Sequence, residues 1–70
     1  MIERLWRVRK DTHKMDARVE PAGDDARVVL TIYYDSQLIT TTSHPSRADA
    51  AGEAARRLRD LLRAGWTSHW

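Results

Sequence analysis

The stretch that decides the fold is VVLTIYYDSQLITTT, residues 28–42, which has the pattern of two β-strands joined by a tight turn. Both arms are rich in β-branched and aromatic residues, which favour extended backbone. The pair DS at 35–36 is short enough for a two-residue hairpin turn, although it lacks the glycine that such turns favour. The hairpin is apolar or hydroxyl-bearing on both sides. One side can face the core, so the question is what the other side faces.

Two further segments with period-two alternation precede this hairpin. Residues 3–10 place Trp6 and Val8 on one side, with Leu5 and arginines on the other. Residues 14–20 alternate in the same way, with Ala17 at the centre of the apolar side. Such alternation is typical of half-buried strands. The expected strands are residues 3–10, 14–20, 26–34 and 37–43. The order of the strands at the sheet edges is left open by the sequence.

The period changes after residue 45 from that of a strand to that of a helix. Ser46 and Asp49 have the spacing of an N-terminal capping box, and Gly65 supplies the left-handed residue that often ends a helix. Between them, apolar residues recur at steps of three and four. These are Ala48, Ala51, Ala55, Leu58 and Leu62, with Ala54 and Leu61 widening the stripe. We therefore predict a helix over about 46–64.

The order of these elements predicts an α+β fold in a single domain, residues 1–70. Short loops favour an antiparallel β-meander of three to four strands, with one C-terminal α-helix packed on one face. Residues 65–70 are expected to form a short tail. In this tail Trp66 is expected to contact Leu61 as part of the helix cap, and Trp70 to fold back onto the protein.

Composition narrows the class of protein. The chain has no cysteine, which excludes disulfides and thiolate metal sites. The start, MIERLWRVRK, is too highly charged for a signal peptide. No stretch approaches the roughly 20 apolar residues of a membrane span. We expect a cytoplasmic protein with no membrane partner.

The net charge of +2 is unevenly distributed. Residues 1–18 carry six cations against three acids, whereas residues 19–46 carry one cation against four acids. Basic ends around an acidic middle are compatible with affinity for nucleic acid, with complementarity between copies of the chain, or with simple solvation of a small domain.

The predicted hairpin defines a candidate interaction face. A two-residue turn would place Ile32 opposite Ile39 and Leu30 opposite Thr41 on the side towards the helix. The reverse side would then carry Val29, Thr31, Tyr33, Leu38, Thr40 and Thr42, with no charge within the hairpin. One helix covers only one side of such a sheet, and solvated antiparallel faces are usually charged.

Three interpretations of this uncharged face remain open. The first is that the face is exposed to solvent and consists of residues that simply favour strands. The second is that it is buried against a second copy or another protein, because contiguous apolar patches usually mark contact sites. The third is that a platform for nucleic acid is formed by Arg7, Arg9, Arg18 and Tyr33. We expect a homodimer joined through this outer face or an edge strand, with nucleic-acid binding as the alternative.

The sequence offers no catalytic, cofactor-binding or metal-binding residues. His13, His44 and His69 are far apart in the sequence and match no local metal-ligand spacing. Asp24 and Asp25 read as turn formers, because they lack the alternating ligands of a calcium loop. No glycine-rich phosphate loop or small-molecule substrate is identified. The expected function is therefore that of a non-enzymatic interaction module without a cofactor.

Overall fold

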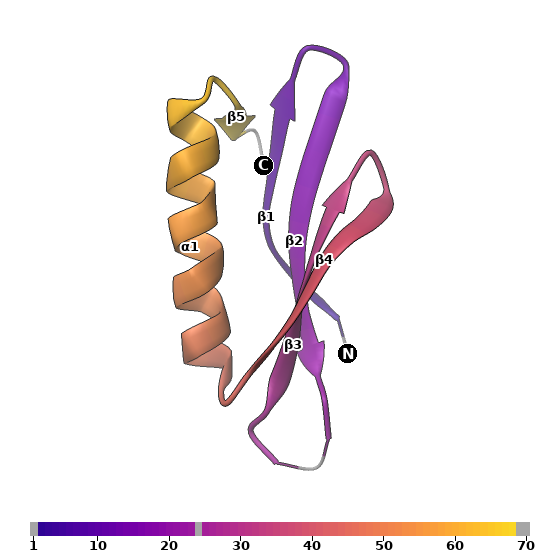
Figure 1. The fold of residues 1–70 in the computed structure, drawn as a ribbon, viewed down its shortest axis with the longest axis vertical. Helices are drawn as coiled ribbons and strands as arrows, with labels where there is room; N and C mark the ends of the chain where they lie inside the picture. Colours follow the sequence, from indigo (N-terminus) through magenta and orange to yellow (C-terminus); the bar gives the residue numbers. More distant parts are fainter. Residues whose placement is uncertain (1, 24, 69–70) are drawn as a thin grey trace.

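The structure, a computed structural model, describes residues 2–23 and 25–68. Within this part of the chain the elements are β1 Glu3–Lys10, β2 His13–Pro21, β3 Val28–Tyr34, β4 Gln37–His44, α1 Arg47–Arg63 and β5 Thr67–Ser68. The strands form one antiparallel sheet in the order β4-β3-β2-β1-β5, and α1 lies along one face of it (Figure 1). This confirms the predicted ββββα architecture.

The expected tail differs from the prediction in one respect. Thr67 and Ser68 form the short strand β5, which pairs with Arg9 and Val8 of β1. A strand of two residues is too short to show a periodic pattern, so it could not be predicted from the sequence. Trp70 and its expected fold-back lie outside the described residues.

Both ends of α1 are capped as the sequence predicts. The Ser46 hydroxyl accepts a hydrogen bond from the backbone N–H of Asp49. At the other end, the backbone N–H of Trp66 donates to the Leu61 carbonyl at 3.0 Å, and Gly65 has a positive φ of 99°. This pattern is a Schellman cap, which ends the helix and turns the chain back towards the sheet.

The core lies between α1 and the helix-facing side of the sheet. Its buried members are Trp6, Val8, Ala17, Val19, Leu30, Ile32, Ala50 and Ala54. The helix contributes only alanines to this set, so its backbone lies close to the strands. The predicted helical stripe is confirmed for Ala54, which is buried, and for Leu58 and Leu61, which pack against the core. It is wrong for Ala48 and Ala55, which are exposed, and for Leu62, which is 43% exposed. The sheet instead selects the line through Ala50 and Ala54.

The β3–β4 turn is a two-residue turn without glycine. Asp35 and Ser36 both have positive φ, 50° and 72°, which is the requirement of the hairpin turn that matches the strand twist. The Asp35 carboxylate is held by the neighbouring hairpin: the His13 ring Nδ1 donates to it at 2.8 Å and the Lys14 backbone N–H at 3.0 Å. The two turns at this end of the sheet therefore support each other.

A bulge corrects the predicted register of β4. Tyr33 pairs with Leu38 as predicted, but Ile32 pairs with Thr40, so Ile39 is an extra residue in the strand. Residues directly opposite each other share a face, and one added residue reverses the face of everything that follows. Thr40 and Thr42 therefore lie on the helix-facing side, opposite Ile32 and Leu30, and not on the outer face.

A second bulge lies in β1. Arg4 pairs with Arg18 and Trp6 with Ala17, which leaves Leu5 as the extra residue. Arg4 thereby points to the outer face, although strict alternation would put it on the side of Trp6. Leu5, expected among the arginines, packs instead against the core.

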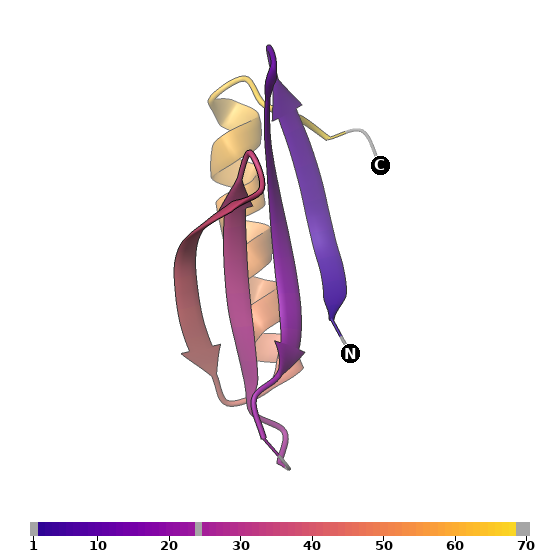
Figure 2. The same ribbon diagram turned by 90° about the vertical axis from the view of Figure 1, so that its right-hand side faces the viewer.

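The opposite face of the sheet carries no helix in the described structure. Figure 2 looks onto this face, with α1 behind the strands and with β4 and β1 to either side of the central pair. No helix in residues 2–23 and 25–68 has the length and apolar character needed to cross a membrane.

Candidate functional site

The sheet side turned away from α1 is the candidate site, and we call it the outer face. It is defined by the outward positions of the four long strands. These are Arg4, Arg7, Arg9, Lys14, Asp16, Arg18, Glu20, Val29, Thr31, Tyr33, Leu38, Thr41 and Ser43. The β1 and β2 members form a cationic half, and the β3 and β4 members form an uncharged half.

The cationic half is organised around a buried carboxylate. Asp16 is only 7% exposed, and it accepts a hydrogen bond of 2.7 Å from the Arg18 Nε. The Arg4 Nε lies 4.0 Å from the same carboxylate oxygen. The hydrogen bond to Asp16 raises the pKa of Arg18 above its ordinary value. A buried carboxylate needs such partners, so Asp16 fixes the positions of the cations beside it.

Arg18 joins the two halves of the outer face. Its guanidinium carbon lies 4.3 Å from the centre of the Tyr33 ring, a distance typical of a cation–π contact. Arg18 also supplies a backbone carbonyl that accepts a hydrogen bond from the Thr31 hydroxyl. The structure thus brings together Arg18 and Tyr33, two of the four residues that the sequence proposed for nucleic acid. It places Arg7 and Arg9 on the same face.

The uncharged half differs from the predicted face in its β4 residues. Val29, Thr31 and Tyr33 are half-buried in β3, and Leu38 in β4 is 55% exposed. Thr41 and Ser43 take the outer positions that the prediction gave to Thr40 and Thr42. Ile39, at the bulge, is 54% exposed. The largest exposed apolar surface of this half therefore lies on β4.

Two hollows lie on the cationic half, one of them extending to the turn between β1 and β2. One, of about 310 Å³, is lined by Arg7, Arg9, Thr12, His13 and Lys14. The other, of about 210 Å³, is lined by Arg4, Arg7, Lys14, Asp16, Arg18 and Ser36. They share Arg7 and Lys14, so they adjoin. Their linings are polar and mostly cationic, which suits small anionic groups.

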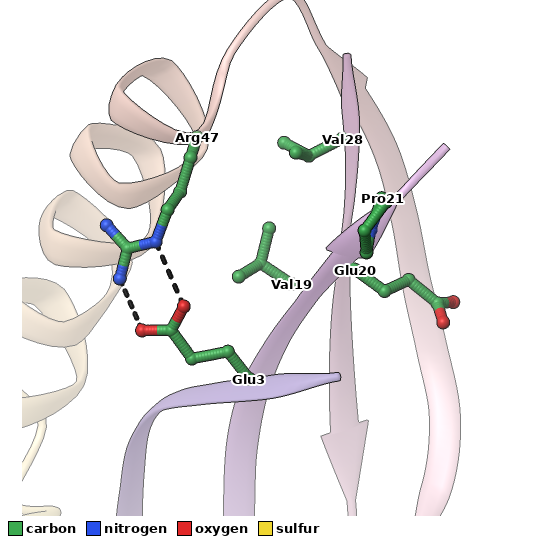
Figure 3. Close-up of a pocket in the computed structure, with 6 residues that line it drawn as sticks. All are labelled: Glu3, Val19, Glu20, Pro21, Val28 and Arg47. Atoms are coloured by element: carbon green, nitrogen blue, oxygen red, sulfur yellow. Dashed lines mark hydrogen bonds and ion pairs between the residues drawn. The ribbon is translucent and has the colours of Figure 1, made fainter. Parts of the chain in front are cut away.

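A third hollow, of about 240 Å³, opens where α1 begins beside the sheet (Figure 3). Val19, Val28 and Pro21 form apolar walls, and an ion pair between Arg47 and Glu3 spans the gap from helix to strand. The hydrogen bond from Arg47 lowers the pKa of Glu3. Glu20 points away from the gap (Figure 3). This hollow marks the end of the core, where the helix and the sheet diverge.

The histidines serve local contacts. His13 donates to Asp35, and its ring stacks on Tyr34 with the ring centres 5.4 Å apart. His44 lies 2.9 Å from the Thr42 hydroxyl. His69 lies outside the described residues. In the part of the chain that the structure describes, no three histidine, aspartate or glutamate side chains gather as metal ligands would.

Sequence reasoning missed two members of the cationic half, Arg4 and Lys14. Lys14 continues the alternation of Asp16 and Arg18, so a signal for it was present. Arg4 reaches the outer face only through the bulge at Leu5, for which the sequence gives no sign. Comparison with protein-family models, with curated proteins and with solved structures finds no match to this chain.

Proposed function

We propose that this chain is a non-enzymatic interaction module that self-associates by pairing the β4 edge strands of two copies. The observation that carries the proposal is the character of that edge. β4, Gln37–His44, is eight residues long and ends the sheet on one side. It contains no Asp, Glu, Lys, Arg or Pro. Long uncharged edge strands can pair with a strand of another chain, and natural proteins usually prevent this with charged residues, proline or a covering segment.

The other edge of the same sheet has such protection. β1 carries the charged residues Glu3, Arg4, Arg7, Arg9 and Lys10. Its C-terminal part is also covered by β5, through the pairs Val8–Ser68 and Arg9–Thr67. The bulge at Ile39 is the only one of the usual edge devices in β4. The two edges of the sheet thus differ in charge and in coverage, the two features that control whether another strand can be added.

A second copy is the partner that fits this edge. Two identical uncharged strands can pair antiparallel about a two-fold axis without bringing like charges together. Pairing would continue the sheet and cover the backbone of β4 together with part of the exposed Leu38, Ile39 and Thr41 side chains. It would also add to the buried surface of a chain that, at 70 residues, buries only about 60% of its unfolded surface.

The edge fits better than the outer face as the contact. Packing two outer faces over their full width would bury the cations of each copy against either the cationic or the uncharged half of the other, at a cost in desolvation. The Arg18 guanidinium already covers one side of the Tyr33 ring, which reduces the aromatic surface that the uncharged half offers to a second copy. We therefore keep the homodimer expected from the sequence and, of its two possible contacts, propose the edge strand and not the outer face.

The proposal includes no catalysis and no cofactor. Several carboxylates that lie beside arginines are engaged in ion pairs, as in Asp16 with Arg18, Glu3 with Arg47, and Glu53 with Arg57. A cytoplasmic location is part of the same proposal, since a chain without cysteine gains nothing from an oxidising compartment.

Sedimentation velocity over about 1–100 μM tests the association. We expect a concentration-dependent species of twice the 8.1 kDa chain mass. Thr41→Lys places a cation at the centre of the exposed edge and should shift the equilibrium to monomer. Ala55→Lys adds the same charge on the exposed side of α1 and should leave association unchanged. An 8.1 kDa species at every concentration would rule the proposal out.

Single-cysteine crosslinking locates the contact, because the chain has no cysteine of its own. Opposed residues of antiparallel strands have Cα atoms about 4.5–5.5 Å apart, within the range that a disulfide spans. Among cysteine substitutions at positions 40–43, the one at the two-fold axis should give a covalent dimer on mild oxidation. Ala55→Cys should not. A dimer that no β4 cysteine crosslinks, and that Tyr33→Glu dissociates, would place the contact on the outer face instead.

A further inference from the structure

The cationic half of the outer face is a second surface that self-association through β4 does not use. It holds five cations, Arg4, Arg7, Arg9, Lys14 and Arg18, against Asp16 and Glu20. All seven residues belong to β1 and β2, so the surface is complete in a single chain. We propose that this half binds the phosphate backbone of a nucleic acid, with little dependence on base sequence.

Cross-strand pairing concentrates positive charge at a cost to the fold. Arg4 lies directly opposite Arg18, and Arg9 lies directly opposite Lys14. Like charges in opposed positions of an antiparallel pair destabilise the sheet. Asp16 offsets this cost for the pair Arg4–Arg18. The opposed pair Arg9–Lys14 has no such carboxylate among the ion pairs of the described residues, so an anionic partner outside the chain would relieve its repulsion.

The cations of the helix behave differently. Arg47 pairs with Glu3, Arg56 and Arg57 both pair with Glu53, and Arg63 lies 3.8 Å from Asp60. Carboxylates of the chain itself therefore neutralise most of the positive charge on α1. The excess of cations is concentrated on β1 and β2, which is why the binding surface is assigned to the sheet and not to the helix.

The spacing of the cations suits a chain of phosphates. Arg4 and Arg9 stand five residues apart on β1, roughly 16 Å at about 3.3 Å per residue. One strand of duplex DNA presents a phosphate about every 3.4 Å of axis, so the row faces roughly five nucleotides. The two adjoining polar hollows, which share Arg7 and Lys14, lie along this row.

The contact between Arg18 and the Tyr33 ring favours recognition of the nucleic-acid backbone over recognition of the bases. Proteins that read single-stranded bases stack them on exposed aromatic rings. One side of the Tyr33 ring is already occupied by the Arg18 guanidinium. In the described part of the outer face there is no second aromatic ring. Phosphate contacts then dominate, and they carry no direct sequence information.

Fluorescence anisotropy with labelled oligonucleotides of about 20 nucleotides, titrated at about 25–300 mM NaCl, tests the proposal. Duplex and single-stranded probes of two unrelated sequences are compared. We expect both sequences to bind equally. If four of the five cations contact phosphates, affinity for the duplex should fall about 150-fold between 50 and 200 mM salt. The single-stranded arm shows which form of backbone binds more tightly.

Two matched double variants distinguish binding at this surface from an effect of the net charge of the chain. Arg9→Gln with Lys14→Gln removes an opposed like-charged pair, so the fold should be kept, as circular dichroism can verify. The same salt change should then cost only about 12-fold in affinity. Arg59→Gln with Arg63→Gln removes equal charge from α1 and should bind like the unmodified chain. Absence of binding at the lowest salt, or equal losses in the two double variants, would overturn the proposal. Neither result depends on whether β4 pairs.

Discussion

The indole Nε1 of Trp6 donates a hydrogen bond of 2.7 Å to the backbone carbonyl of Ala54. This contact joins the first strand to the middle of the helix across 48 positions of sequence. Both residues are buried, at 7% and 1% exposed. A buried indole needs a partner for its N–H, and the small Ala54 side chain lets the helix backbone supply one. The position of α1 on the sheet is thus fixed by a polar contact within an apolar core.

Trp6→Phe should lower the free energy of unfolding by about 1–3 kcal/mol. The substitution removes the donor to Ala54 and part of the buried ring volume, while the helix keeps its own backbone hydrogen bonds. Urea denaturation followed by far-ultraviolet circular dichroism measures the change. A variant as stable as the parent chain would show that the hydrogen bond and ring fill contribute nothing net.

Ala50→Leu and Ala55→Leu form a matched pair that tests which side of α1 meets the sheet. Ala50 is 0% exposed, so the larger side chain would push the helix away and cost about 1–3 kcal/mol. Ala55 is exposed, and the same substitution there should change stability by less than about 0.5 kcal/mol. Thermal and urea unfolding of both variants provide the comparison. Equal effects would contradict the observed orientation of the helix.

The meander and the capped helix could be predicted because several local signals agree. Alternation marks β1 and β2, and β-branched residues mark β3. Ser46 and Gly65 fit the two ends of α1. The face of α1 could be predicted only in part. Leu58, Leu61 and Ala54 lie on the core side as expected, but alanines stand on several sides of the helix, and only contact with the strands distinguishes the buried Ala50 from the exposed Ala48 and Ala55.

The register of β4 could not be predicted for a related reason. Residues 38–44, LITTTSH, contain no alternation between apolar and charged side chains, so a shift by one position costs little in burial. The bulge at Ile39 exchanges Thr40 and Thr42 for Thr41 and Ser43 on the outer face. The bulge at Leu5 likewise brings Arg4 to the cationic half. Bulges thus account for most of the difference between the predicted and the observed candidate site.

Acid should weaken the fold through carboxylates that are hydrogen-bonded in the native state. The pKa of Asp35 is lowered by the hydrogen bond from His13 and by that from the Lys14 backbone. The pKa values of Glu3 and Glu53 are lowered by their arginine partners. A carboxylate whose pKa is lower in the folded state binds protons more readily when unfolded. Its contribution is therefore complete above the unfolded pKa of about 4 and is lost as the pH falls through the folded value.

Asp35→Asn isolates the part of this acid response that belongs to the two turns. Asparagine tolerates the left-handed backbone at position 35 and still offers an oxygen to the Lys14 N–H, but it does not titrate. We expect the parent chain to lose stability between about pH 5 and pH 3, and the variant to lose less over the same interval. Urea midpoints across this range measure both. Identical pH profiles would mean that the link between His13 and Asp35 does not stabilise the fold, and that the two hairpins are held together by the sheet alone.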